Sequence, residues 1–227
     1  MSGAGGAAGA GGAGGESAFK GRSTPRRMSR RYDLFRRFMI VLCRVLFGLT
    51  IRGMEKVPKA GPLVVAANHT QYPDPVLVCM AVPRRMQWMG KKQLYEPPYR
   101  RLFEFIGSFP VDREGGGRAG VKIALGYLAE GWALGIFPEG THKDDGTARE
   151  AKSGAVMLAI RGGAPVVPVY VSKIPGPLAR LRGERLRLIV GDPIRMDDTL
   201  RGGKAYRDAA DEVLRTIYAL PGKDRPS

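Results

Sequence analysis

Two continuous apolar runs, each ending in a polar cluster, constrain the fold of this chain more than any other feature. Leu63-Val-Val-Ala-Ala67 precedes Asn68-His-Thr-Gln-Tyr-Pro-Asp74, and Ala133-Leu-Gly-Ile-Phe137 precedes Pro138-Glu-Gly-Thr-His142. A short apolar run without alternation is typical of a strand buried on both faces, as in a sheet covered by helices. Polar residues at the carboxyl ends of such strands are where α/β sheets bind ligands.

The rest of the chain continues an α/β rhythm. Pro168 inside one predicted strand favours an edge position or a bulge for that strand. The further strands are expected at residues 86–90, 107–111, 166–171 and 185–190, and the helices at residues 75–81, 95–106, 117–130, 153–161 and 205–220.

Composition divides the chain into four segments. Residues 1–19 are rich in Gly and Ala, and we expect their first fifteen residues to be disordered because they cannot bury enough surface to offset ordering entropy. Residues 20–52 form a basic amphipathic segment, residues 53–221 the folded domain and residues 222–227 a short tail.

The formal net charge of +16 indicates an anionic partner, either nucleic acid or an acidic membrane. In the basic segment, a helix near residues 29–51 would place Arg30, Arg37 and Arg44 on one face. Phe35, Met39, Leu42 and Leu46 would form the opposite face. This pattern favours a helix lying in a membrane interface. The alternative is an amphipathic helix packed on its own domain.

Cysteine and histidine are scarce. Cys43 and Cys79 are far apart and outside any Cys-x-x-Cys pattern, so neither a disulfide framework nor a cysteine metal site is expected. The two histidines are His69 and His142, which leaves few candidates for a base that titrates near neutral pH.

His69 and Asp74 form the first candidate constellation. Asp74 before Pro75 has the character of a helix N-cap, and the turn between would fold its carboxylate back onto the imidazole of His69. A carboxylate on one ring nitrogen leaves the other to accept a proton from an alcohol. Taken alone the pattern is weak, because an N-cap Asp needs no catalytic role.

Three further strand ends carry candidate residues. Arg113 follows the strand at 107–111 and has the geometry to grip a phosphate, although such an Arg is more often solvated. Glu139 and Thr141 flank Gly140 in a turn that can hold hydroxyl groups, or that is a plain Glu-Gly turn. Val167-Pro-Val169 is expected to shape an apolar wall.

Together these four clusters resemble the glycerolipid acyltransferase superfamily, typified by lysophosphatidic acid acyltransferases. Its Asn-His-x4-Asp motif matches Asn68, His69 and Asp74, and its strand ending in Asp-Arg matches Gly107, Asp112 and Arg113. Its Phe-Pro-Glu-Gly-Thr-Arg motif matches residues 137–141, and its Val-Pro-Val motif matches residues 167–169. The resemblance covers about residues 53–195 and implies a mixed central sheet flanked by helices.

The resemblance also implies a reaction. A fatty acyl group would pass from a thioester, acyl-CoA or acyl carrier protein, to a lysophospholipid hydroxyl, most simply that of 1-acylglycerol-3-phosphate. His69 would be the base, oriented by Asp74, with no metal or other cofactor. Arg113 would bind the acceptor phosphate with Lys91, Lys92 and Lys152, and Glu139, Gly140, Thr141 and His142 would complete the acceptor site.

One position departs from the family pattern. The third motif normally ends in Arg, where this chain has His142, and a neutral imidazole cannot make the two-pronged phosphate contact. Lys143 would supply a point charge instead. Another lysolipid or lipid-like alcohol is therefore the alternative acceptor.

A non-enzymatic binder of anionic surfaces, including nucleic acid, is the rival from another class. The sequence contains none of the helix-turn-helix, zinc-finger or RNA-binding signatures that would favour this rival. We expect no nucleic-acid partner and a peripheral or monotopic protein on the cytoplasmic face of the cell membrane.

Overall fold

The computed structural model describes residues 30–91, 95, 100–111, 118–140 and 151–223. The predicted tail 1–19 and residues 224–227 of the predicted tail 222–227 lie outside the described residues, whereas residues 222–223 belong to the last helix. The strands are β1 (Thr50–Arg52), β2 (Leu63–Ala67), β3 (Met86–Lys91), β4 (Ser108–Val111), β5 (Ala133–Ile136), β6 (Val166–Val171) and β7 (Arg187–Val190). The helices are α1 (Arg30–Phe47), α2 (Asp74–Ala81), α3 (Arg100–Phe105), α4 (Arg118–Ala129), α5 (Gly154–Arg161), α6 (Pro177–Leu181) and α7 (Gly203–Lys223), with a 3₁₀ turn at Met54–Lys56.

The strands form one mixed sheet of seven, in the order β1-β7-β6-β2-β5-β3-β4. The pairs from β6 through β2, β5 and β3 to β4 are parallel, whereas β7 runs antiparallel to β6. The expected α/β fold with a mixed central sheet is confirmed. The predicted clusters that follow β2 and β5 meet at one edge, because these strands are parallel neighbours.

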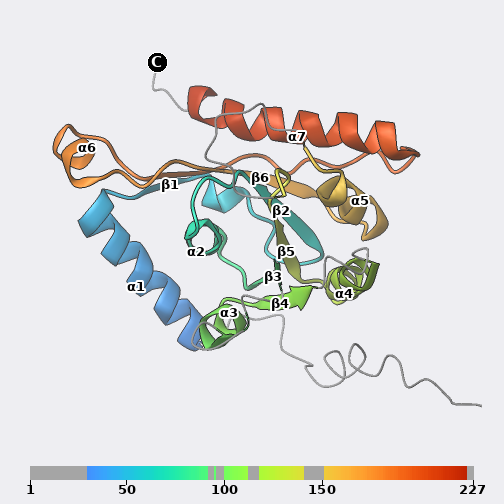
Figure 1. The fold of residues 1–227 in the computed structure, drawn as a ribbon, viewed down its shortest axis with the longest axis horizontal. Coiled ribbons are helices and arrows are strands. Elements are labelled where there is room, and N and C mark those ends of the chain that lie inside the picture. The colour runs from blue at the N-terminus through green and yellow to red at the C-terminus, as the bar shows by residue number, and fades with distance from the viewer. Residues whose placement is uncertain (1–29, 92–94, 96–99, 112–117, 141–150, 224–227) are drawn as a thin grey trace, which may run out of the picture.

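Helices cover both faces of the sheet (Figure 1). On one face, α1 and α2 pack on Val65, Ala67 and Val169. On the other, α4, α5 and α7 pack on Val64, Ala66 and Val166. Because successive residues of a strand point to opposite faces, each apolar run fills both cores, which explains its lack of alternation.

Several predicted boundaries differ in the structure. The helix expected at residues 95–106 is described only over α3, and β1 and α6 were not expected. The prediction of an edge position for the strand with Pro168 is wrong, because β6 lies between β7 and β2. A bulge accommodates the proline instead. Val169 pairs with Val190, the Pro168 carbonyl accepts the Gly191 N–H, and Val166 pairs with Ile194, so the segment after β7 has one extra residue between Gly191 and Ile194.

The packing of α1 corrects the predicted faces of this helix. Phe35 meets Phe105 edge to face at 5.0 Å, and Met39 packs on the core beside α2. The apolar row that we expected in a membrane therefore packs for the most part on the domain, although Leu46 stays exposed.

A second apolar row of α1 faces outward. Leu34, Phe38, Val41 and Val45 are between 58% and 73% exposed, and they are spaced four, three and four residues apart along one side of the helix. The exposed Arg30, Arg37 and Arg44 line the flank of this row. Among the described residues, no helix is long and apolar enough to cross a membrane.

Buried Arg36 attaches α1 to α2. Its Nε donates to the carbonyl of Cys79 at 3.2 Å, and its Nη2 donates to the carbonyl of Met80 at 2.8 Å. These carbonyls belong to the last turn of α2, where helix carbonyls lack intrahelical partners.

Burial raises the pKa of the Cys79 thiol, and Cys43 is also buried and free, in line with the expectation of no disulfide.

Candidate active site

The loop that carries His69 begins with a fully buried asparagine. The side-chain amide of Asn68 donates to the carbonyl of Val171 at 2.8 Å, and its oxygen accepts the Val171 N–H at 2.7 Å. This pair of bonds extends the β2–β6 ladder by one step through a side chain. It fixes where the loop leaves the sheet, and hence the position of the His69 backbone.

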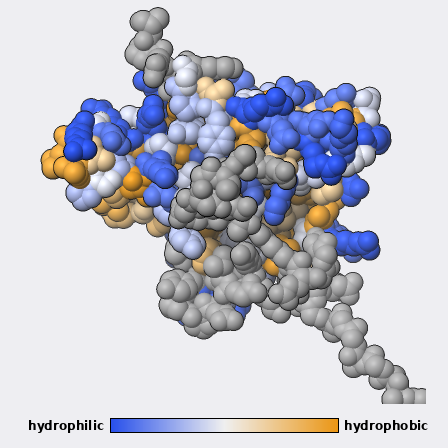
Figure 2. All heavy atoms as spheres, turned by 45° about the horizontal axis from the view of Figure 1, so that its top comes forward, coloured by the Kyte–Doolittle hydropathy of each residue, from blue (hydrophilic) through white to orange (hydrophobic). Residues whose placement is uncertain are grey.

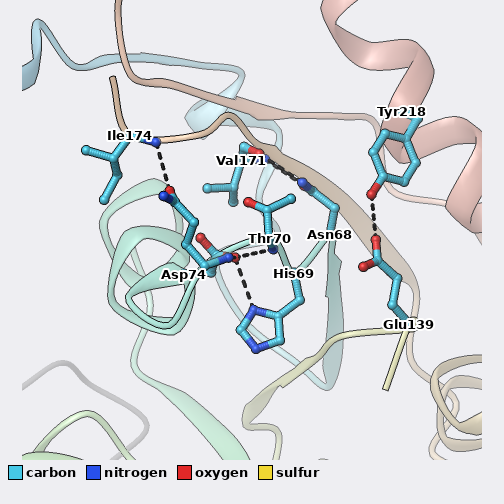
Figure 3. Close-up of polar contacts among 9 residues, drawn as sticks. Asn68, His69, Thr70, Asp74, Glu139, Val171, Ile174 and Tyr218 are labelled. Carbon is cyan, nitrogen blue, oxygen red and sulfur yellow. Dashed lines mark hydrogen bonds and ion pairs between the residues drawn. The ribbon is translucent and has the colours of Figure 1, made fainter. Parts of the chain in front are cut away.

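Three donors converge on one carboxylate oxygen of Asp74 (Figure 3). Oδ2 lies 3.0 Å from Nδ1 of His69, 2.6 Å from the backbone nitrogen of Thr70 and 2.8 Å from that of Gln71. Asp74 is fully buried at the first turn of α2, where the helix dipole favours a negative charge. The backbone bonds hold the carboxylate in place, so it can fix the imidazole in one orientation.

The face of the imidazole is packed as well as its edge. The ring of His69 stacks on Phe137 at 4.1 Å between centroids, and Phe137 stacks on Trp88 at 5.1 Å. The side chain of His69 is still 17% exposed. With Nδ1 on Asp74, Nε2 points to the other side, which is the geometry of a general base.

Glu139 lies on the next strand end, almost buried. The hydroxyl of Tyr218 on α7 donates to Oε1 of Glu139 at 2.6 Å (Figure 3). The predicted site contained no residue of α7. Tyr218 is 79 residues away in the sequence, and no pattern around it indicates this contact.

Gly140 and Lys152, two of the predicted site residues, lie next to each other. Gly140 has a left-handed backbone with φ of 74°, and a Cβ there would lie 2.5 Å from the Lys152 side chain. The backbone nitrogen of Lys152 donates to the carbonyl of Pro138 at 2.7 Å. The left-handed backbone therefore favours glycine, whereas the flexible end of the Lys152 side chain could move aside for a Cβ.

The remaining predicted residues are only partly placed. Lys91 is the last residue of β3. Gly107 has φ of 85°, and a Cβ there would lie 2.1 Å from the carbonyl oxygen of Met86, so this glycine has a structural reason. The predicted Lys92, Arg113, Thr141 and His142, together with Asp112 and Lys143, lie outside the described residues.

An open groove of about 1340 Å³ is lined by Asn68 and Thr70, the sequence neighbours of His69, but not by His69 itself. Tyr218 also lines it, and the groove continues between α7 and the connection from β6 to β7. Four cationic residues on its walls had not been predicted as site residues: Lys173, Arg185, Arg187 and Arg215. In the described part of the chain, no group of His, Cys, Asp and Glu is arranged to hold a metal ion.

The sequence profile of the Acyltransferase family matches residues 48–172, more than half of the chain. The chain belongs to the acyltransferase family, and it is an acyltransferase enzyme. The matched segment holds the His69–Asp74 pair and Glu139, whereas Tyr218 lies beyond it.

Curated relatives have the same type of name. The chain is 30% identical to "1-acyl-sn-glycerol-3-phosphate acyltransferase" of Bacillus subtilis over 66% of this chain and 76% of the relative. It is 29% identical to the beta enzyme of Homo sapiens over 54% of this chain but only 45% of that protein.

A solved structure shows the same fold. It is the 1-acyl-sn-glycerophosphate (LPA) acyltransferase PlsC from Thermotoga maritima, with a TM-score of 0.59, 24% identity, and coverage of 88% of this chain and 86% of that one.

Proposed function

We propose that this enzyme transfers a fatty acyl group from an acyl thioester to the free hydroxyl of a lysophospholipid. The preferred acceptor is 1-acylglycerol-3-phosphate, and the product is then phosphatidic acid. The observation that carries the proposal is the His69–Asp74 pair, in which a buried carboxylate held by two backbone N–H groups orients an imidazole at a strand end. The relatives' names support the choice of acceptor.

In the proposed mechanism Nε2 of His69 accepts the proton of the acceptor hydroxyl as its oxygen attacks the thioester carbonyl carbon. Asp74 stabilises the imidazolium that forms. The tetrahedral intermediate then collapses, the carbon–sulfur bond breaks, and the imidazolium returns its proton to the leaving thiolate. The reaction requires no metal or cofactor beyond the thioester co-substrate, acyl-CoA or acyl carrier protein.

The charge around the site supports an acceptor with a phosphate. The groove lined by Asn68 and Thr70 carries Lys173, Arg185, Arg187 and Arg215 against Glu184 and Asp211. Lys152 adds a further cation over Gly140. We propose that Arg113, Lys91, Lys92 and Lys152 bind the phosphate, as the family resemblance implies, and that Glu139, Gly140, Thr141 and His142 hold the rest of the head.

The outward apolar row of α1 supports attachment to a membrane. Leu34, Phe38, Val41 and Val45 would enter the headgroup layer, and the flanking arginines would meet anionic lipid. We propose a peripheral or monotopic protein on the cytoplasmic face of the cell membrane. This geometry brings the enzyme to the surface that contains its lipid substrate.

A panel of lysolipids tests the proposed reaction. The purified protein receives labelled acyl-CoA or labelled acyl carrier protein with lysophosphatidic acid, other lysophospholipids or a neutral-headed lysolipid, and products are identified by mass spectrometry. Label in phosphatidic acid is the expected result. Transfer to the other acceptors alone would contradict the choice of acceptor.

His142→Arg tests the phosphate requirement. Arg is always protonated and meets two phosphate oxygens at once, so the KM for lysophosphatidic acid should stay equal or fall. For a neutral-headed lysolipid the added charge should give no benefit. A clear rise in the KM for lysophosphatidic acid, with faster turnover of the neutral lipid by the wild type, would favour the alternative acceptor.

A further inference from the structure

The connection between β6 and β7 leaves the sheet at the edge that carries His69. It spans residues 172–186, contains α6 at its tip and is called the α6 hairpin below. Leu178 is 61% exposed and Leu181 is 84% exposed. Arg182 and Arg185 on the same hairpin are also exposed. Two exposed leucines among arginines are the composition of a segment that enters a lipid interface.

The α6 hairpin is fixed to the end of α1. The backbone nitrogen of Leu186 donates to the carbonyl of Phe47 at 3.0 Å, and that of Thr50 donates to the carbonyl of Leu186 at 2.9 Å. The guanidinium of Arg180 packs on Gly48, where a Cβ would lie 3.0 Å from its Cζ. In Figure 1 the C-terminal end of α1 and α6 both lie on the left of the molecule.

The hairpin is also fixed to the loop of the catalytic base. The side-chain oxygen of Gln71 accepts the backbone N–H of Ile174 at 2.8 Å (Figure 3). The next residue, Tyr72, is 88% exposed. The end of α1, the tip of the α6 hairpin and the loop of His69 are therefore held together at one edge of the sheet.

Apolar and charged side chains alternate at this end of the molecule. Figure 2 shows hydrophobic side chains at the left end, where α6 lies, directly beside strongly hydrophilic ones. A protein partner would be expected to cover a more continuous apolar patch, whereas leucines interspersed with arginines match the acyl and anionic layers of a bilayer surface.

We infer that the tip of the α6 hairpin is a second contact with an anionic bilayer, which together with α1 fixes the edge carrying His69 against the lipid. The inference rests on the proposed role of α1. One amphipathic helix on a surface leaves the body free to rock about the helix axis. A second contact beyond the end of α1 removes that freedom, so the strand ends face the layer that holds the acceptor.

Tryptophan reporters test the contact directly. Both native tryptophans, Trp88 and Trp132, are buried, so an added exposed tryptophan gives a separable signal. Leu181→Trp should be quenched by doxyl-labelled lipid in phosphatidylglycerol vesicles. Arg207→Trp on the exposed start of α7 is the matched control and should not be quenched. Val45→Trp reports on α1 in the same vesicles.

Quenching of Val45→Trp without Leu181→Trp would overturn the second contact and leave α1 as the sole one. A blue shift of Leu181→Trp that grows with protein concentration in the absence of lipid would also overturn it, because a second copy would then cover the tip. Absence of quenching in every variant, with normal acyl transfer, would reject both lipid contacts but leave the proposed reaction intact.

A second experiment measures vesicle affinity and acyl transfer in the double variant Leu178→Asp with Leu181→Asp. Affinity for the vesicles should fall by about 10- to 100-fold, because two leucines no longer enter the lipid. Transfer to a lysolipid in vesicles should fall with it, whereas transfer to a water-soluble short-chain acceptor should stay at the wild-type level. Arg207→Glu changes the net charge by the same amount and should affect neither. Equal vesicle affinity in the double variant would contradict the inference.

Discussion

The hydroxyl of Tyr218 donates a 2.6 Å hydrogen bond to Oε1 of Glu139, which joins the last helix to the turn after β5. The bond holds one oxygen of a nearly buried carboxylate toward α7. In the proposed acceptor site this bond fixes the orientation of the Glu139 carboxylate. Tyr218 is thus a positioning residue for Glu139.

Tyr218→Phe should weaken acceptor binding more than catalysis. A hydrogen bond to a charged group contributes about 1.5–3 kcal/mol, so the KM for the lysolipid should rise roughly tenfold or more while kcat changes little. Tyr206→Phe, on the same helix but away from Glu139, is the control and should match the wild type. Equal kinetics for both variants would show that Glu139 does not depend on this bond.

Asp74→Asn should keep the loop folded but remove the negative charge of the Asp74 side chain. The imidazolium that forms during transfer would lack its partner, and the amide can hold the ring in the wrong tautomer. We expect kcat to fall on the order of 10²-fold or more. Asp192→Asn, which removes an exposed partner of Lys56, should leave kcat unchanged. An Asp74→Asn enzyme with normal kcat would exclude the orienting role.

Arg36→Met should destabilise the fold. The variant leaves the buried carbonyls of Cys79 and Met80 without their hydrogen-bond donor. Part of this loss is offset because the charged guanidinium no longer has to be desolvated on folding. We expect the free energy of unfolding in urea to fall by about 2–4 kcal/mol. Arg37→Met, one residue on and exposed, removes only an i,i+4 pair with Asp33 and should change it by about 0.5 kcal/mol or less.

Replacing the three exposed arginines of α1 by Glu should weaken vesicle binding. Each lost cation near an anionic surface contributes about 1 kcal/mol, so Arg30→Glu, Arg37→Glu and Arg44→Glu together should lower affinity about 10²-fold at low salt, before repulsion is counted. Vesicle sedimentation measures this change.

The matched control for that triple variant replaces three exposed arginines elsewhere: one at the end of α5, one just before α7 and one within α7. It carries the same change in net charge, and its vesicle affinity should fall much less. A similar loss in both triple variants would mean that net charge, rather than α1, governs attachment. The control substitutions are Arg161→Glu, Arg201→Glu and Arg207→Glu.

The strands and the His69–Asp74 pair could be predicted because their signals are local. Each apolar run is buried on both faces, and Asp74 contacts His69 from only five residues further along the sequence. The orientation of α1 could not be predicted in this way. The helix is apolar on two sides, and periodicity alone does not tell which side the domain buries.

Other features depend on contacts between distant segments. The strand β1 has three residues and exists through its pairing with β7, more than 130 positions away. Tyr218 reaches Glu139 only after α7 has packed across the sheet, and nothing in its neighbourhood marks it as a site residue. The bulge next to Pro168 likewise depends on the register of the segment that follows β7.

The most direct measurement is the rate of acyl transfer from labelled thioester to lysophosphatidic acid by wild type and His69→Ala, with the unfolding midpoint of each in urea. His69 lies at a strand end and is partly exposed, so the midpoint should be close to that of the wild type. Loss of the base should lower the rate on the order of 10²- to 10⁴-fold. A folded His69→Ala protein that transfers acyl groups at a rate near that of the wild type would contradict the account.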